Sequence, residues 1–184
     1  DVLSNHYEGT PYDPYGSKGT AADAHRFRPI GINRNCQLAV LQIRPYAPEA
    51  CRCVQWMAMG SNAFNTLSPF YGLVSDTPAY LRVTTDSFYW ANRLVAAIAD
   101  PHFGDNVNTI DNYRERTMSF GHRVLRETDA EVAALPDGDD VTLVLEAANE
   151  RIASELRDET DKLLSKVLYT SSMLMRNGFS LSDH

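Results

Sequence analysis

The chain lacks the features that define membrane-spanning, nucleic-acid-binding and secreted proteins. Its apolar runs reach only about six residues, whereas a helix that crosses a bilayer needs about 20. The net charge is −7, and the chain contains no run of Lys and Arg. Both features exclude nucleic acid as the main partner. No internal repeat or low-complexity tract is present, and no targeting leader is visible. We therefore predict neither a membrane nor a nucleic-acid partner.

Cysteine is scarce, with only Cys36, Cys51 and Cys53 in 184 residues. An odd and sparse set fits a reducing compartment better than a disulfide framework, so we predict a cytoplasmic protein. One residue separates Cys51 from Cys53, whereas structural zinc pairs usually have a gap of about two to four. We therefore predict no metal and no cofactor. No histidine lies close to Cys36 in the sequence, and we interpret all three cysteines as buried or incidental thiols.

What is present is typical of a globular domain, with 43% hydrophobic and 22% charged residues over a length that suits one domain. Two apolar runs, residues 38–43 and 54–59, predict strands, and the Pro-rich connection between them predicts an antiparallel hairpin with a long loop. Residues 1–29 offer turn chemistry at nearly every step and predict a long loop packed on a surface. Residues 1–80 thus form the predicted loop and sheet part.

Helical spacing of apolar residues begins near residue 86 and makes residues 86–177 the predicted helical part. Antiparallel strands in the first half and long helices in the second predict an α+β fold, with residues 1–184 as a single C-terminal domain or fragment. The expected helices are residues 86–100 behind a Thr85 or Asp86 cap, residues 109–125, a short piece behind a capping box at Thr128, and residues 140–175 with a stop at Asn177-Gly178.

The second predicted strand ends abruptly at Gly60, and residues 60–71 form a polar loop that contains several aromatic residues. Gly60 permits a bend, and Ser61 and Asn62 can hydrogen-bond the turning backbone, so one interpretation is a plain turn. The other interpretation is a binding site, because Asn62 and Asn65 present amide donors among aromatic side chains. Such donors can polarise a carbonyl oxygen.

A second polar and aromatic segment, residues 4–13, contains His6 in a short window with acidic and aromatic residues. His6 is therefore either a site residue or a loop anchor. Because both segments are turn-rich, aromatic and beside the same predicted sheet, we expect them to lie side by side and to form a pocket. In that pocket we expect the Asn62 amide to donate to a substrate carbonyl oxygen. We expect substrate to be bound by Asn65, His6, Tyr7 and Tyr71, and water to be excluded by Phe64 and Tyr71.

Four motifs occur in one order along the chain: SNHYEGTPYDPYG (residues 4–16), RPIGINR (28–34), QWMAMGSNAFNTLSPFY (55–71) and DSFYWANRLVAAIAD (86–100). Together they resemble the C-terminal part of the PepD-like bacterial dipeptidases, which are cysteine peptidases of the N-terminal-nucleophile hydrolase class and relatives of the secernins. The similar stretch covers about residues 2–129.

This resemblance implies an αββα sandwich fold and a dipeptide substrate. In that family a leader is removed to expose an N-terminal Cys, whose thiol attacks the peptide carbonyl while its own α-amino group acts as base. None of the three cysteines of this chain could provide a free terminal amine. We therefore expect the nucleophile upstream of Asp1 and a C-terminal fragment that is inactive alone. An Asn in the oxyanion hole of related hydrolases favours Asn62, then Asn65.

A rival hypothesis assigns no chemistry to the chain. The long last helix and the aromatic loop could instead bind a partner molecule, and the protein would then be a non-catalytic binding or assembly module. If the chain is part of a sandwich, apolar strand surface around Trp56 is expected to be exposed, and we then expect self-association.

Overall fold

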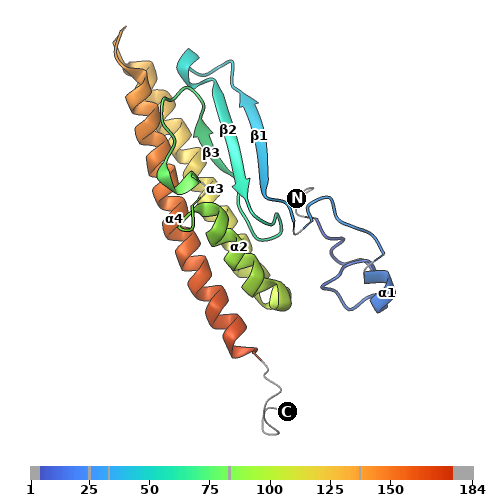
Figure 1. The fold of residues 1–184 in the computed structure, drawn as a ribbon. Helices are drawn as coiled ribbons and strands as arrows, with labels where there is room; N and C mark the ends of the chain where they lie inside the picture. The colour runs from blue at the N-terminus through green and yellow to red at the C-terminus, as the bar shows by residue number, and fades with distance from the viewer. Residues whose placement is uncertain (1–4, 25, 33, 83, 137, 176–184) are drawn as a thin grey trace.

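The computed structural model describes residues 5–24, 26–32, 34–82, 84–136 and 138–175. They form a mixed α/β fold in which three antiparallel strands pack with long helices, in the sheet order β1–β2–β3 (Figure 1). The strands are β1 (Gln37–Ile43), β2 (Cys53–Met59) and β3 (Ser68–Tyr71). The α-helices are α1 (Ala21–Ala24), α2 (Phe88–Ala99), α3 (Phe103–Ala134) and α4 (Val141–Met173), and the short 3-10 helices are η1 (Glu49–Cys51), η2 (Ala79–Leu81) and η3 (Asp100–His102).

The two predicted strands are confirmed, and each begins one residue earlier than expected. They pair antiparallel as a hairpin, with Gln37 opposite Met59 and Ile43 opposite Cys53. Gly60 follows β2 with φ +81°, and its amide donates to the Cys36 carbonyl over 2.9 Å. An added Cβ at Gly60 would lie 3.2 Å from the Asn92 side chain. Glycine is therefore required at this bend for both its backbone conformation and its lack of a side chain.

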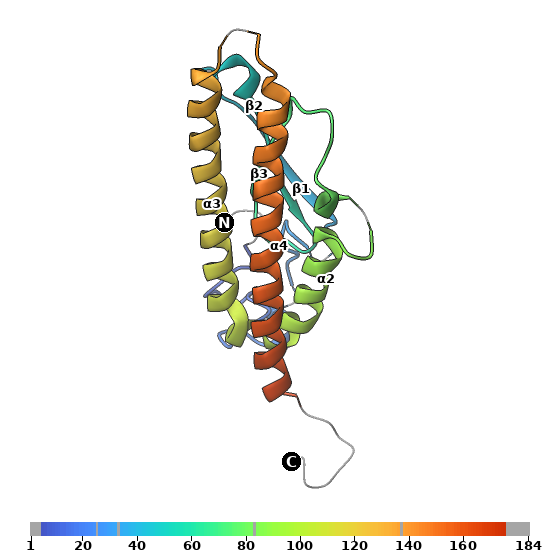
Figure 2. The same cartoon turned by 90° about the vertical axis from the view of Figure 1, so that its left-hand side faces the viewer.

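The expected loop over residues 60–71 was wrong at its end, because residues 68–71 form β3 and pair with β2. A four-residue strand that contains Pro69 carries a weak sequence signal. Its outer edge is stabilised by α4: the Tyr71 amide donates to Asn149 Oδ1 over 2.8 Å, and Asn149 Nδ2 donates to the Tyr71 carbonyl over 3.1 Å. The Asn149 side chain thus replaces a neighbouring strand. Figure 2 shows α4 lying in front of β3.

The helix prediction for residues 109–125 and a separate short piece was wrong, since α3 runs unbroken from Phe103 to Ala134. Thr128 is not a cap: it lies inside α3 and is buried against the core. At α2, Ser87 precedes the helix in place of the expected Thr85 or Asp86, and its hydroxyl donates to the Thr84 carbonyl. The last helix is confirmed, with an Asp140 cap that accepts from the Thr142 amide. The expected stop at Asn177-Gly178, like Ser4 of the first predicted loop, lies outside the described residues.

At Gly121, α3 packs closely against Pro69 of β3. A Cβ at this position would lie 2.5 Å from Pro69 Cδ and 2.8 Å from Pro69 Cγ. We expect Gly121→Ala to destabilise the protein by about 1–3 kcal/mol through overpacking, although alanine by itself favours a helix by ~1 kcal/mol. Gly104→Ala is the matched control, because it lies in the same helix with no atom within 4 Å of the added Cβ. Thermal unfolding should show a lower midpoint for the first variant only; equal midpoints would contradict the contact.

Trp56 does not form the exposed apolar surface that we expected. It is only 9% exposed, its ring lies 4.8 Å from that of His122 on α3, and its indole N–H donates to Gln42. The exposed apolar residues of the sheet lie instead on β1, where Leu41 is 78% and Ile43 75% exposed. β1 is also an edge strand. Within the described ranges, no helix combines the length and the apolar character that crossing a bilayer requires.

Candidate functional site

The two predicted loops meet at the end of the sheet where β2 ends, beside the start of α3 (Figure 1). The His6 ring packs edge-on against Phe103 at 4.9 Å and Tyr15 at 5.2 Å, and Phe64 packs against the same Phe103 ring at 5.5 Å. His6, Ser61, Ala63 and Phe64 also line one cavity of about 250 Å³. The expectation that the loops lie side by side is therefore confirmed for the described residues.

His6 is the polar centre of the first loop and is 8% exposed. Its Nδ1 lies 3.1 Å from Glu8 Oε1, and its Nε2 lies 3.8 Å from Asp13 Oδ1. Carboxylates on both sides of an imidazole fix the orientation of its ring. His6 can therefore be a site residue, because its ring lines the cavity, or a loop anchor.

Asn65 supports the turn interpretation of the second loop. Its Nδ2 donates to the carbonyls of Met59, over 3.2 Å, and Gly60, over 3.1 Å. Both hydrogens of the amide are therefore used to close the bend after β2. Asn62 is buried like Asn65, with 4% and 5% of each residue exposed. Neither asparagine lines the cavity, but Ser61 and Ala63 on either side of Asn62 both do.

Arg114 on α3 holds this loop and was missed in the sequence. Its Nε donates to the Asn65 carbonyl over 2.9 Å, and its Nη2 donates to the carbonyls of Asn62, over 3.1 Å, and Ala63, over 2.5 Å. Its Nη1 binds Asp111 at 2.9 Å. One guanidinium thus binds three backbone carbonyls of the loop that carries Asn62. A lone Arg in a helix gives no signal of this role.

Arg114→Lys is expected to lower the free energy of unfolding by about 2 kcal/mol, since the buried carbonyls lose charge-assisted donors that one ammonium cannot replace. Denaturant unfolding measures the effect. Asp111→Ala is the control, because the Asp111 side chain is 54% exposed and its loss leaves the carbonyl contacts in place. Equal stability of Arg114→Lys and the wild type would show that the loop does not depend on the guanidinium.

Of the five predicted site residues, only His6 lines the cavity, and Tyr7 and Tyr71 make other contacts. The Tyr7 hydroxyl donates to the Arg28 carbonyl over 3.3 Å, and its ring packs near Phe27. Tyr71 is 2% exposed in β3, and its hydroxyl bonds the Leu125 carbonyl and Asp129. The expectation that Tyr71 shields the pocket with Phe64 was wrong, because β3 carries it back to the opposite end of the sheet.

The thiols are unpaired by disulfides, and Cys51 is fully buried. Burial, with a contribution from the Asp129 carboxylate, raises the pKa of the Cys51 thiol to about 11. A neutral thiol is a poor nucleophile, so Cys51 is chemically inert near neutral pH. Among the described residues, no group of three or more His, Cys, Asp and Glu side chains could hold a metal ion.

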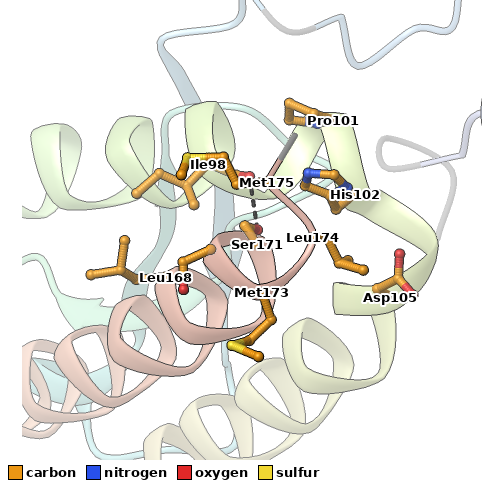
Figure 3. Close-up of a pocket in the computed structure, with 10 residues that line it drawn as sticks. Ile98, Pro101, His102, Asp105, Leu168, Ser171, Met173, Leu174 and Met175 are labelled. Atoms are coloured by element: carbon orange, nitrogen blue, oxygen red, sulfur yellow. Dashed lines mark hydrogen bonds between the residues drawn. The ribbon is translucent and has the colours of Figure 1, made fainter. Parts of the chain in front are cut away.

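A larger cavity of about 810 Å³ lies elsewhere, between η3, the start of α3 and the end of α4 (Figure 3). Ile98, Leu168 and Leu174 contribute apolar surface, and the Ser171 hydroxyl donates to the Ile98 carbonyl over 3.0 Å. None of the residues predicted from the sequence lines it. We therefore place the candidate site in the smaller cavity, where charged and aromatic groups of two distant loops converge.

The structure by itself defines a mixed α/β protein with a small polar cavity at one end of its sheet. Comparison with known proteins places this chain among the peptidases. The model of Peptidase family C69 matches residues 1–116, which include both loops of the cavity, and the chain belongs to this family. The resemblance to dipeptidases that the four motifs predicted is confirmed.

Curated relatives support the same assignment. The chain is 46% identical to a dipeptidase of Bifidobacterium longum over 99% of this chain and 42% of that protein. It is 48% identical to a probable dipeptidase A of Streptococcus pyogenes serotype M3 over 99% of this chain and 39% of that protein. The chain is 35% identical to dipeptidase A of Lactobacillus helveticus over 98% of this chain and 39% of that protein. The chain thus spans about two fifths of the length of these relatives.

Proposed function

We propose that this chain is the C-terminal part of a cysteine dipeptidase and forms one wall of its substrate site. The observation that carries the proposal is the 46–48% identity to proteins named as dipeptidases over nearly the whole chain. The cavity between the two loops lies within the residues that match the peptidase family. In this proposal the Asn62 amide donates to the substrate carbonyl oxygen, and His6 and Asn65 belong to the substrate-binding residues around it.

The nucleophile in this proposal is an N-terminal Cys that precedes Asp1 in the full-length protein. Cys51 is buried with a raised pKa, and Cys36 and Cys53 are exposed thiols inside the chain, which have no free α-amino group to act as base. In this proposal the sheet and the helices beside it form part of an αββα sandwich in the full-length protein. Three free cysteines also support a reducing, cytoplasmic location.

Dipeptide hydrolysis by the full-length protein and by the 184-residue chain tests this proposal. We expect turnover of unmodified L-dipeptides by the full-length protein and none by the chain alone, because the chain lacks an activated nucleophile. Replacement of the N-terminal Cys by Ala should abolish the turnover. A folded full-length protein that hydrolyses no dipeptide would contradict the proposal and favour the non-catalytic binding module.

We further propose that the isolated chain self-associates through β1. This edge strand has an open row of backbone groups, and Leu41 and Ile43 expose apolar side chains beside it. Sedimentation should show dimers or larger species at high concentration, and Leu41→Lys should shift them toward monomers by adding charge to the edge. Leu143→Lys, at a 64% exposed residue on α4, is the control. A wild-type chain that stays strictly monomeric would contradict this proposal.

A further inference from the structure

The cavity between the two loops carries an excess of positive charge. Arg28 and Arg34, which bracket the RPIGINR motif, both line it, and Asp100 at the end of α2 contributes one carboxylate. The chain as a whole has a net charge of −7. Two guanidinium groups around one small cavity therefore stand out against an acidic protein and favour an anionic ligand.

Both guanidinium groups are available to a ligand. Arg28 and Arg34 are exposed, and neither guanidinium makes a hydrogen bond or an ion pair with another described residue. By contrast, Arg44 and Arg114 are bound to carboxylates and carbonyls elsewhere in the fold. Asp100 accepts a 2.6 Å hydrogen bond from the Tyr15 hydroxyl, and its one carboxylate can offset the charge of only one of the two guanidinium groups.

The size of the cavity restricts the ligand. At about 250 Å³ it lies just below the roughly 300–1,000 Å³ of pockets for drug-sized molecules. Phe64, Pro29 and Ile32 add apolar surface beside the two arginines. A cavity with these properties suits a small molecule that combines an apolar side chain with one carboxylate.

We infer that Arg28 and Arg34 bind the free C-terminal carboxylate of a short peptide substrate and thereby restrict the site to peptides that end there. Planar guanidinium groups match carboxylate geometry with paired hydrogen bonds, and an amidated peptide end would leave them unpaired. The inference rests on the proposed dipeptidase function and adds to it the two side chains that bind the C-terminal carboxylate of the substrate.

The test compares one L-dipeptide with its C-terminal amide on the full-length protein. The wild type should prefer the free acid. In Arg28→Ala and Arg34→Ala, KM for the free acid should rise about tenfold to a hundredfold with little change in kcat, since a binding contact shared by ground and transition state is lost. KM for the amide should stay the same. Arg→Lys at either position should recover part of the preference by keeping the charge.

Arg126→Ala is the matched control, because Arg126 is exposed on α3 and lines none of the cavities described above. An unchanged preference for the free acid in both alanine variants would overturn the inference and leave the dipeptidase function intact. A lower melting temperature with equal losses on both substrates would also overturn it, since the arginines would then pair with another part of the full-length protein. A wild type that hydrolyses neither substrate would refute the proposed function itself.

Discussion

Replacement of Asp129 by Ala is expected to lower the free energy of unfolding by about 3 kcal/mol, because it leaves a buried guanidinium without its charged partner. Arg44 is 4% exposed and binds both Asp129 oxygens, at 2.7 and 3.0 Å. The Tyr71 hydroxyl donates to the same carboxylate over 2.9 Å, and the Cys51 carbonyl accepts from Arg44. One carboxylate on α3 thus connects the end of β1, the end of β3 and the connection before β2.

Denaturant unfolding of the chain measures this loss. The double variant Arg44→Met, Asp129→Leu should recover much of it, since no charge remains buried without a partner. Asp76→Ala is the control, because Asp76 pairs with Arg82 on the surface, with the two side chains 76% and 55% exposed. Its midpoint should stay near that of the wild type. A wild-type midpoint for Asp129→Ala would show that Arg44 finds another partner or reaches solvent.

Asn62→Ala in the full-length protein is expected to reduce turnover about a hundredfold to a thousandfold, which corresponds to roughly 3–4 kcal/mol of barrier. This prediction rests on the proposed role of Asn62 as the amide donor to the substrate carbonyl. The Arg114 contacts to the Asn62 and Ala63 carbonyls hold the loop in place, so the loss of the side chain should leave the backbone where it is.

Turnover and melting temperature, measured together, separate a catalytic role from a structural one. Asn65→Ala is the comparison, because the Asn65 amide closes the bend through the Met59 and Gly60 carbonyls. That variant should lower the melting temperature by more than Asn62→Ala does. Normal turnover per folded molecule in Asn62→Ala would remove Asn62 from the site.

Much of the fold could be predicted because its signals are local. The apolar runs of β1 and β2, the glycine at the bend and the helical spacing of α4 each depend on a few neighbouring residues. Two errors have a common cause, since β3 and the continuous α3 both depend on distant contacts. β3 is held by Asn149, and the middle of α3 packs against Pro69 through Gly121.

The candidate site shows the same division. The pairing of the loops around His6 and Asn62 followed from turn chemistry and aromatic content. Arg114 could not be predicted, since an Arg on a helix surface and one that binds three loop carbonyls look alike in sequence. The position of Tyr71 was predicted wrongly, because an aromatic residue at the end of a loop gives no sign that a short strand carries it away.

The sequence by itself determined the two long strands, the glycine bend, the last helix and the family, because propensity, periodicity and ordered motifs act over short stretches of chain. Only the tertiary structure decided which polar groups meet. Asn62 and Arg114 are 52 residues apart, Tyr71 and Asn149 are 78 apart, and Arg44 and Asp129 are 85 apart. Contacts over such separations depend on how whole elements pack, and no local pattern specifies that packing.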